Sequence, residues 1–79
     1  MSIRDYHRRD SVICTVLYKN SKGSVLKIKG VTENPYVILH DIYLARNSVV
    51  LVSIAYISPD FGYVKVTPDS LEYAEYTAA

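Results

Sequence analysis

Lysine, tyrosine and histidine side chains recur where the sequence alternates between apolar and polar residues. Lys27 and Lys29 are two residues apart, as are Tyr63 and Lys65. Side chains two residues apart in a strand share a face, so each pair projects to one side of its strand. Cations bind phosphate, and aromatic rings stack on bases. The spacing predicts a nucleic-acid-binding face of Lys27, Lys29, Tyr63 and Lys65, with His40 nearby. In the alternative interpretation the lysines only solubilise the strands and protect their edges.

Tyrosine is over-represented in this chain, which has eight tyrosines, one phenylalanine and no tryptophan. The core of a small domain cannot hold so many, so we expect some at the surface, where they stack on bases or contact a protein. Tyr18 and Tyr36 are the additional candidates for stacking. Leu71, Tyr73 and Tyr76 near the C-terminus are candidates for protein contact, or else cover an open end of the fold.

The remaining reactive side chains do not form a catalytic or metal-binding set. Cys14 could pair with His7 or His40 as nucleophile and base, but it stands in an apolar segment, where we expect a buried, unreactive thiol. One cysteine and two distant histidines do not supply the three or four ligands of a metal site. The three glycines are isolated and form no phosphate-binding loop. We therefore expect neither an enzyme nor a bound metal or cofactor.

Length and composition indicate one small domain. The chain has 79 residues, is 49% apolar and 22% charged, and has a formal net charge of +1. This composition favours a globular fold, and the charge excludes a histone-like protein and an acidic DNA mimic. Residues 1–10 lack the apolar stretch of a signal peptide, and the longest apolar run, 49–57, is far shorter than the roughly 20 residues of a membrane helix. We expect a cytoplasmic protein with no membrane partner.

Five short segments have the composition of β-strands, because they are rich in valine, isoleucine and tyrosine and are bounded by turn residues. Alternation places Tyr18 on the same face as Val16, and Tyr56 on the same face as Ile54. Five such strands predict an all-β fold, a small closed barrel without exposed sheet edges. The expected strands are 11–18, 24–30, 36–40, 49–57 and 63–67.

Turns and flanking segments complete the expected organisation. A loop of about five residues joins the first two strands, with Gly23 suited to a positive φ, and Gly62 serves likewise before the fifth strand. The connector 41–48 is expected to contain one helical turn. Residues 1–10 form a short basic arm, which is a frayed end, a single helical turn or a contact to phosphate. Residues 68–79 form a short C-terminal helix or tail.

Several segments carry features of one known family. Residues 39–44, Leu-His-Asp-Ile-Tyr-Leu, look like the end of a third strand and a short connector, and 49–66 look like a valine-rich fourth strand, a tight turn and a fifth strand. Gly-Ser-Val-Leu at 23–26 is similar to the start of a second strand. Together these segments resemble the OB-fold RNA-binding domain of the S-one ribosomal-protein type, over roughly residues 11–67. That family often has aromatic residues on its second strand, where this chain has Val25 and Leu26.

The resemblance implies a small OB-like barrel that binds single-stranded nucleic acid, with RNA favoured over DNA. A second hypothesis remains open from the residues themselves: a protein-interaction or assembly barrel, as a subunit or inhibitor of a larger machine. Surplus tyrosine and near-neutral charge suit this class. It includes a self-associating Sm-like or SH3-like barrel.

Overall fold

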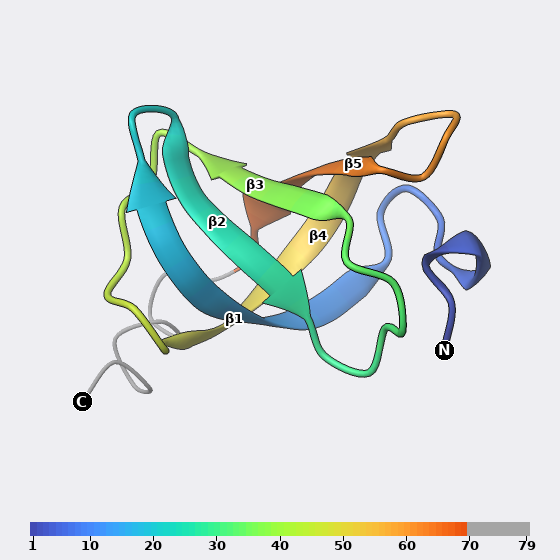
Figure 1. Cartoon of the computed structure of the whole chain (residues 1–79), viewed down its shortest axis with the longest axis horizontal. Helices are drawn as coiled ribbons and strands as arrows, with labels where there is room; N and C mark the ends of the chain where they lie inside the picture. Colours follow the sequence, from blue (N-terminus) through green and yellow to red (C-terminus); the bar gives the residue numbers. More distant parts are fainter. Residues whose placement is uncertain (70–79) are drawn as a thin grey trace.

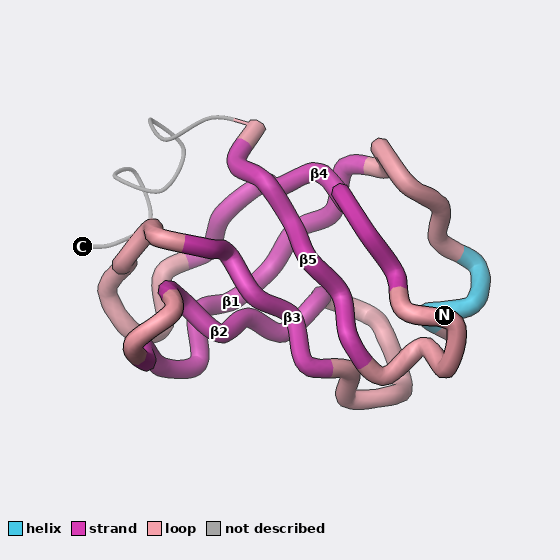
Figure 2. Tube along the Cα trace, turned by 90° about the horizontal axis from the view of Figure 1, so that it is seen from above, coloured by secondary structure: helices cyan, strands magenta, loops and turns pink. Residues whose placement is uncertain are grey.

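Residues 1–69, the part of the chain that the computed structural model describes, form a closed five-stranded β-barrel (Figure 1). The strands follow one another around the barrel in the order β1-β2-β3-β5-β4, and β4 pairs with β1 to close it. β3 and β5 are parallel, and the other neighbours are antiparallel. Figure 2 shows the strands crossing one another as they wrap around the interior. The elements are the 3-10 helix η1 (Ile3–Asp5) and strands β1 (Ser11–Asn20), β2 (Gly23–Ile28), β3 (Tyr36–His40), β4 (Val49–Ile57) and β5 (Tyr63–Pro68).

The predicted all-β class and closed five-stranded barrel are confirmed. β3 and β4 have the predicted bounds. β1 extends to Asn20, β2 runs from Gly23 to Ile28 instead of over 24–30, and β5 ends one residue later than predicted, at Pro68. A two-residue turn therefore replaces the predicted five-residue loop, and the Asn20 side-chain oxygen closes it by accepting from the N–H groups of Lys22 and Gly23. The predicted C-terminal helix or tail, 68–79, lies outside the described residues apart from Pro68, which ends β5, and Asp69, which is not helical.

The barrel interior is filled by the inward side chains of all five strands. Most of them are β-branched, which suits a pleated surface that is buried on one side. Burial of each such side chain contributes about 1.5–3 kcal/mol, so this core is the main stabilising term of a domain without disulfides. The buried cluster is Ile3, Val12, Cys14, Val16, Leu26, Ile28, Val31, Val37, Leu39, Val50, Val52, Ile54, Val64 and Val66.

Two β-bulges interrupt the alternation and change the faces of two tyrosines. The pairing of β1 with β2 slips between Val16 and Tyr18, so Leu17 is the extra residue. The pairing of β4 with β5 slips likewise between Ile54 and Tyr56. A one-residue slip moves every later side chain to the other face of the sheet. The prediction that Tyr18 and Tyr56 share the face of Val16 and Ile54 is therefore wrong, and the two tyrosines are 51% and 48% exposed.

Gly23 begins β2 where another backbone passes too close for a side chain. Its φ is +150°, and a Cβ there would collide with the carbonyl oxygen of Leu39 and lie 2.9 Å from the amide nitrogen of Asp41. Gly23 is also the register partner of His40. The positive φ predicted for Gly23 is present, and the close approach of β3 explains why only glycine fits.

In the loop between β4 and β5, the residue with a positive φ is not the one predicted. Phe61, not Gly62, has the left-handed backbone, with φ +59°. The Phe61 ring packs against the core, and the guanidinium of Arg4 lies 4.6 Å from its centroid. Packing of the ring therefore offsets a backbone conformation that bulky residues rarely adopt.

Segments outside the strands close the two ends of the barrel (Figure 1). At one end Ile3 of η1 is buried in the core cluster, and at the other Ile42 and Leu44 of the connector pack against it. The connector contains no helical turn, contrary to the prediction. The Ser24 hydroxyl donates to the carbonyl of Ile42 at 2.7 Å and accepts from the N–H of Leu44 at 2.9 Å, which holds the connector in an extended path.

Glu33 fastens the N-terminal arm to the loop between β2 and β3. Its carboxylate accepts from the hydroxyl of Ser2 at 2.6 Å and from the N–H of Ile3 at 2.9 Å. These bonds, that of Ser2 above all, lower the pKa of Glu33 from 4.5 to about 2. The ionised carboxylate thus holds η1, and with it the buried Ile3, against the barrel.

Replacement of Gly23 by alanine should destabilise the fold by about 2–4 kcal/mol, because the new Cβ meets backbone rather than a movable side chain. Urea unfolding measures this loss. Gly30→Ala is the matched control, since Gly30 also has a positive φ (+81°) but nothing lies within 4 Å of its Cβ position. The control should cost only about 1–2 kcal/mol. Equal losses in the two variants would contradict the steric explanation.

Stability should fall in acid through Glu33. A group whose pKa is lowered by folding stabilises the fold above its unfolded value, here 4.5, and loses that contribution as the pH falls towards about 2. Glu33→Gln should therefore flatten the dependence of the unfolding free energy on pH between 4.5 and 2. Carbon NMR titration of the Glu33 carboxyl gives an independent check, in which Ser2→Ala should raise its pKa. An unchanged pKa in Ser2→Ala would show that this hydroxyl is not the main cause.

Candidate nucleic-acid interface

A continuous row of residues crosses the outside of the barrel. Tyr18 on β1 is the register partner of Val25 on β2, which pairs with Ile38 on β3. Ile38 is the partner of Lys65 on β5, and Lys65 pairs with Tyr56 on β4. The two bulges are what place Tyr18 and Tyr56 at the ends of this row. The row therefore has apolar residues in the middle, with tyrosines and a lysine around them.

Val25 and Ile38 are buried although they lie outside the core cluster. They are 4% and 1% exposed, and a second small apolar layer thus covers the outer face of β2 and β3. Tyr36 belongs to the same face, and its hydroxyl accepts from the side-chain nitrogen of Asn20 at 2.8 Å. That bond joins the start of β3 to the end of β1, so the Tyr36 side chain must extend across β2, the strand between them.

Three tyrosine rings, Tyr36, Tyr63 and Tyr56, form what we call the tyrosine band. Tyr36 and Tyr63 are register partners on the parallel strands β3 and β5, and their ring centroids are 5.9 Å apart with an interplanar angle of 19°. Tyr56 is 6.1 Å from Tyr63, at 57°. Each distance lies within the range of favourable aromatic pairs. The band runs across three strands and offers aromatic surface to a flat ligand.

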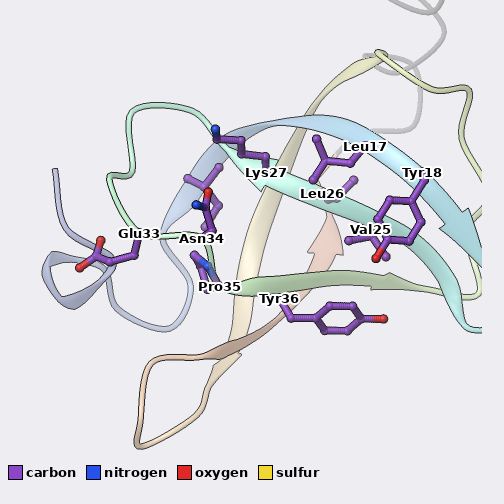
Figure 3. Close-up of a pocket in the computed structure, with 10 residues that line it drawn as sticks. Leu17, Tyr18, Val25, Leu26, Lys27, Glu33, Asn34, Pro35 and Tyr36 are labelled. Atoms are coloured by element: carbon purple, nitrogen blue, oxygen red, sulfur yellow. The ribbon is translucent and has the colours of Figure 1, made fainter.

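A half-open groove of about 270 Å³ adjoins the band on the outside of β1 and β2. The bulge residue Leu17 and the neighbouring Tyr18 lie on one side, and Tyr36 lies on the other (Figure 3). Lys27 projects from β2 farther along the groove. The walls of the groove are otherwise mainly apolar. The remaining residues of the lining are Val25, Leu26, Ile28, Glu33, Asn34 and Pro35.

The cations on this face are free of ion pairs within the described residues. Lys27 and Lys65 are exposed on adjoining parts of the face, and no Lys or Arg among residues 1–69 lies within ion-pair distance of a carboxylate there. Glu33, the acidic residue of the groove, already accepts hydrogen bonds from Ser2 and Ile3. The face therefore presents, beside aromatic rings, lysine ammonium groups without ion-pair partners among the described residues.

The structure brings together most, but not all, of the residues predicted for the site. Tyr18, Tyr36, Tyr63, Lys27 and Lys65 share the outer face as described. Lys29 lies just after the end of β2, away from the tyrosine band. Its backbone N–H donates to the carbonyl of Ile13 on β1. His40 ends β3, with its Nδ1 3.5 Å from a carboxylate oxygen of Asp41.

Sequence reasoning missed Tyr56, because strict alternation placed it on the face of Ile54, and it did not identify Leu17 as a site residue. Nothing in the local sequence marks either bulge. The residues predicted for protein contact, Leu71, Tyr73 and Tyr76, lie outside the described part of the chain.

The Cys14 thiol and the possible metal ligands within residues 1–69 do not form a second candidate site. Cys14 is buried in the barrel, and burial raises the pKa of its thiol to about 12, so the reactive thiolate is suppressed. No group of three or more His, Cys, Asp or Glu side chains within this range is arranged to hold a metal ion.

Two further observations concern membrane-spanning helices and relatives of this chain. Within residues 1–69 no helix has the length and hydropathy needed to cross a membrane. Comparison with protein-family models, curated proteins and solved structures finds no match to this chain.

Proposed function

We propose that this protein is a small OB-like barrel that binds single-stranded nucleic acid, with RNA favoured, on the outer face of β2, β3 and β5. The observation that carries the proposal is the tyrosine band beside the unpaired Lys27 and Lys65. Aromatic platforms together with cations are the two components of sequence-tolerant single-strand binding.

The strand arrangement supports the same proposal. OB folds are five-stranded Greek-key barrels that bind oligonucleotides on the face of their second and third strands, between two hairpin loops. The groove lies on the outside of β1 and β2 and reaches Tyr36 at the start of β3, in a five-stranded barrel closed between β1 and β4. The preference for RNA rests on the resemblance of residues 11–67 to the S-one type of domain.

Stacking, rather than long-range attraction, supplies most of the expected affinity. A net charge of +1 gives little electrostatic steering. Stacking on an aromatic side chain contributes about 1–3 kcal/mol per base. Three rings would therefore account for several kcal/mol, while the lysines add a salt-dependent part.

A second candidate is a protein-interaction barrel, favoured by the apolar outer face of β1 and β4. Ile13 and Leu17 are 38% and 40% exposed, and Ile13 is the register partner of the partly buried Leu51. Concentration-dependent self-association, lost in Ile13→Lys, would favour this candidate over the first.

Charge reversal at Lys27 or Lys65 should weaken binding of a short mixed-sequence RNA by about tenfold at low salt, because each removes a charge-assisted contact to phosphate. Fluorescence anisotropy at two salt concentrations measures the effect, with DNA of the same sequence in parallel. Arg46→Glu is the charge-matched control, since Arg46 is exposed in the connector at the opposite end of the barrel from the arm. Tight binding that is equally insensitive to all three reversals would rule out this face.

Tyr63→Leu and Tyr56→Leu should each weaken RNA binding by about 5–100-fold, while the slope of log affinity against log salt stays unchanged. Leucine keeps the apolar packing and removes the ring. Tyr43→Leu is the control, because Tyr43 is exposed to a similar extent as Tyr56 but lies in the connector, where its hydroxyl donates to the carbonyl of Ser21. Loss of affinity in the control alone would place the ligand at the other end of the barrel.

A further inference from the structure

The turn between η1 and β1 presents two adjacent arginines, Arg8 and Arg9, to solvent. The N–H of His7 donates to a carboxylate oxygen of Asp10 at 2.8 Å, and the N–H of Asp10 donates back to the carbonyl of His7 at 3.1 Å. These bonds fix the four-residue turn with the arginines at its tip. Both side chains are exposed.

The turn is fixed to the barrel rather than attached only through the chain. The N–H of Arg9 donates to the carbonyl of Ile54 at 2.7 Å, and the N–H of Ile54 donates to the carbonyl of Asp10 at 2.9 Å. Arg9 has φ +78°, a left-handed conformation that usually selects glycine or asparagine. A long cationic side chain thus stands where local preference would place glycine.

The other arginine of the arm is arranged differently. The guanidinium of Arg4 stacks on the Phe61 ring, 4.6 Å from its centroid. Arg8 and Arg9 have no such ring contact and no ion pair within residues 1–69. The nearby carboxylates bond to other groups, since Asp10 accepts from the N–H of His7 and Asp69 accepts from the hydroxyls of Ser11 and Ser53, and neither forms an ion pair with an arginine among residues 1–69.

The arginine turn is continuous with the tyrosine band. Arg8 borders a shallow hollow of about 370 Å³ whose walls include Tyr56, the last ring of the band. It also borders, with Arg9, a second hollow of about 320 Å³ that contains Ser53 and Thr67. The surface from the groove to the arginines is therefore one path, through Tyr36, Tyr63 and Tyr56.

We infer that Arg8 and Arg9 form a second phosphate-binding segment, which binds the backbone of the same single strand beyond Tyr56 and extends the binding site across β4. This inference rests on the proposed function. Guanidinium groups bind phosphate oxygens through two parallel hydrogen bonds, which suits a backbone contact without sequence preference. Short oligonucleotides fill the groove and the band, and only longer ones reach the arginines.

The test compares oligonucleotides of increasing length with the wild-type protein and the Arg8→Ala/Arg9→Gly double variant. Unstructured homopolymeric RNA from about 4 to about 16 nucleotides spans the site sizes of single OB folds. Glycine suits the positive φ of residue 9, so the variant should keep its fold, which an amide NMR spectrum and urea unfolding verify. Arg46→Ala, alone, controls for loss of an exposed arginine elsewhere.

In the wild-type protein the affinity should rise with length and then level off. In the double variant short oligonucleotides should bind as tightly as before, and the affinity should level off at a shorter length. For long oligonucleotides the magnitude of the slope of log affinity against log salt should fall by about 1.4, that is about 0.7 for each lost phosphate contact. Arg46→Ala should follow the wild type.

Three other results would overturn the inference, and they are distinguishable. If the double variant matches the wild type at every length, the arginines do not contact the strand, although the proposed function stands. If the double variant binds short and long oligonucleotides more weakly by the same factor, the arginines do not form an extension that only long strands reach. If no oligonucleotide binds the wild type, the proposed function fails, and this inference fails with it.

Discussion

Closure of a five-stranded sheet on itself is the constraint on which the rest of this structure depends. Strands this short must bend strongly to close a barrel, and bulges and glycines are what allow them to bend. Three features allow the bending here: the extra residue Leu17 in β1, a second bulge before Tyr56 in β4, and Gly23 in β2, which has no side chain. The interior left by closure is narrow, which is consistent with a core built mostly of valine, isoleucine and leucine.

The same bulges determine what lies on the outside. Because each shifts the pairing by one residue, Tyr18 and Tyr56 leave the core face and join Tyr36 and Tyr63 on the outer one. Val25 and Ile38 then lie beneath this outer layer and are almost completely buried. An aromatic surface supported by a buried apolar layer is pre-organised. The protein's side chains therefore lose little conformational freedom when a ligand stacks on them.

The electrostatic character of the candidate site is local. The net charge of the chain is only +1, but its cations and carboxylates have different surroundings. Among residues 1–69 the lysines and arginines make no ion pairs. Glu33, Asp60 and Asp69, in contrast, accept hydrogen bonds that lower their pKa values. Carboxylates of this kind serve the fold, and the cations remain available to phosphate. For the proposed nucleic-acid interface, this division favours recognition through contact rather than through long-range steering.

The sequence by itself determined the number of strands, the bounds of β3 and β4 and most of the core, because runs of β-branched residues between turn residues act locally. It also determined that Lys27, Tyr63 and Lys65 face outwards, since alternation holds wherever pairing is regular. Tertiary structure decided the faces of Tyr18 and Tyr56, the residue with positive φ before β5, and the extended connector held by Ser24. It also brought Tyr36 and Tyr63 together, by pairing β3 with β5 in parallel. These features depend on which strands become neighbours when the barrel closes, and that pairing is a property of the whole chain rather than of any segment.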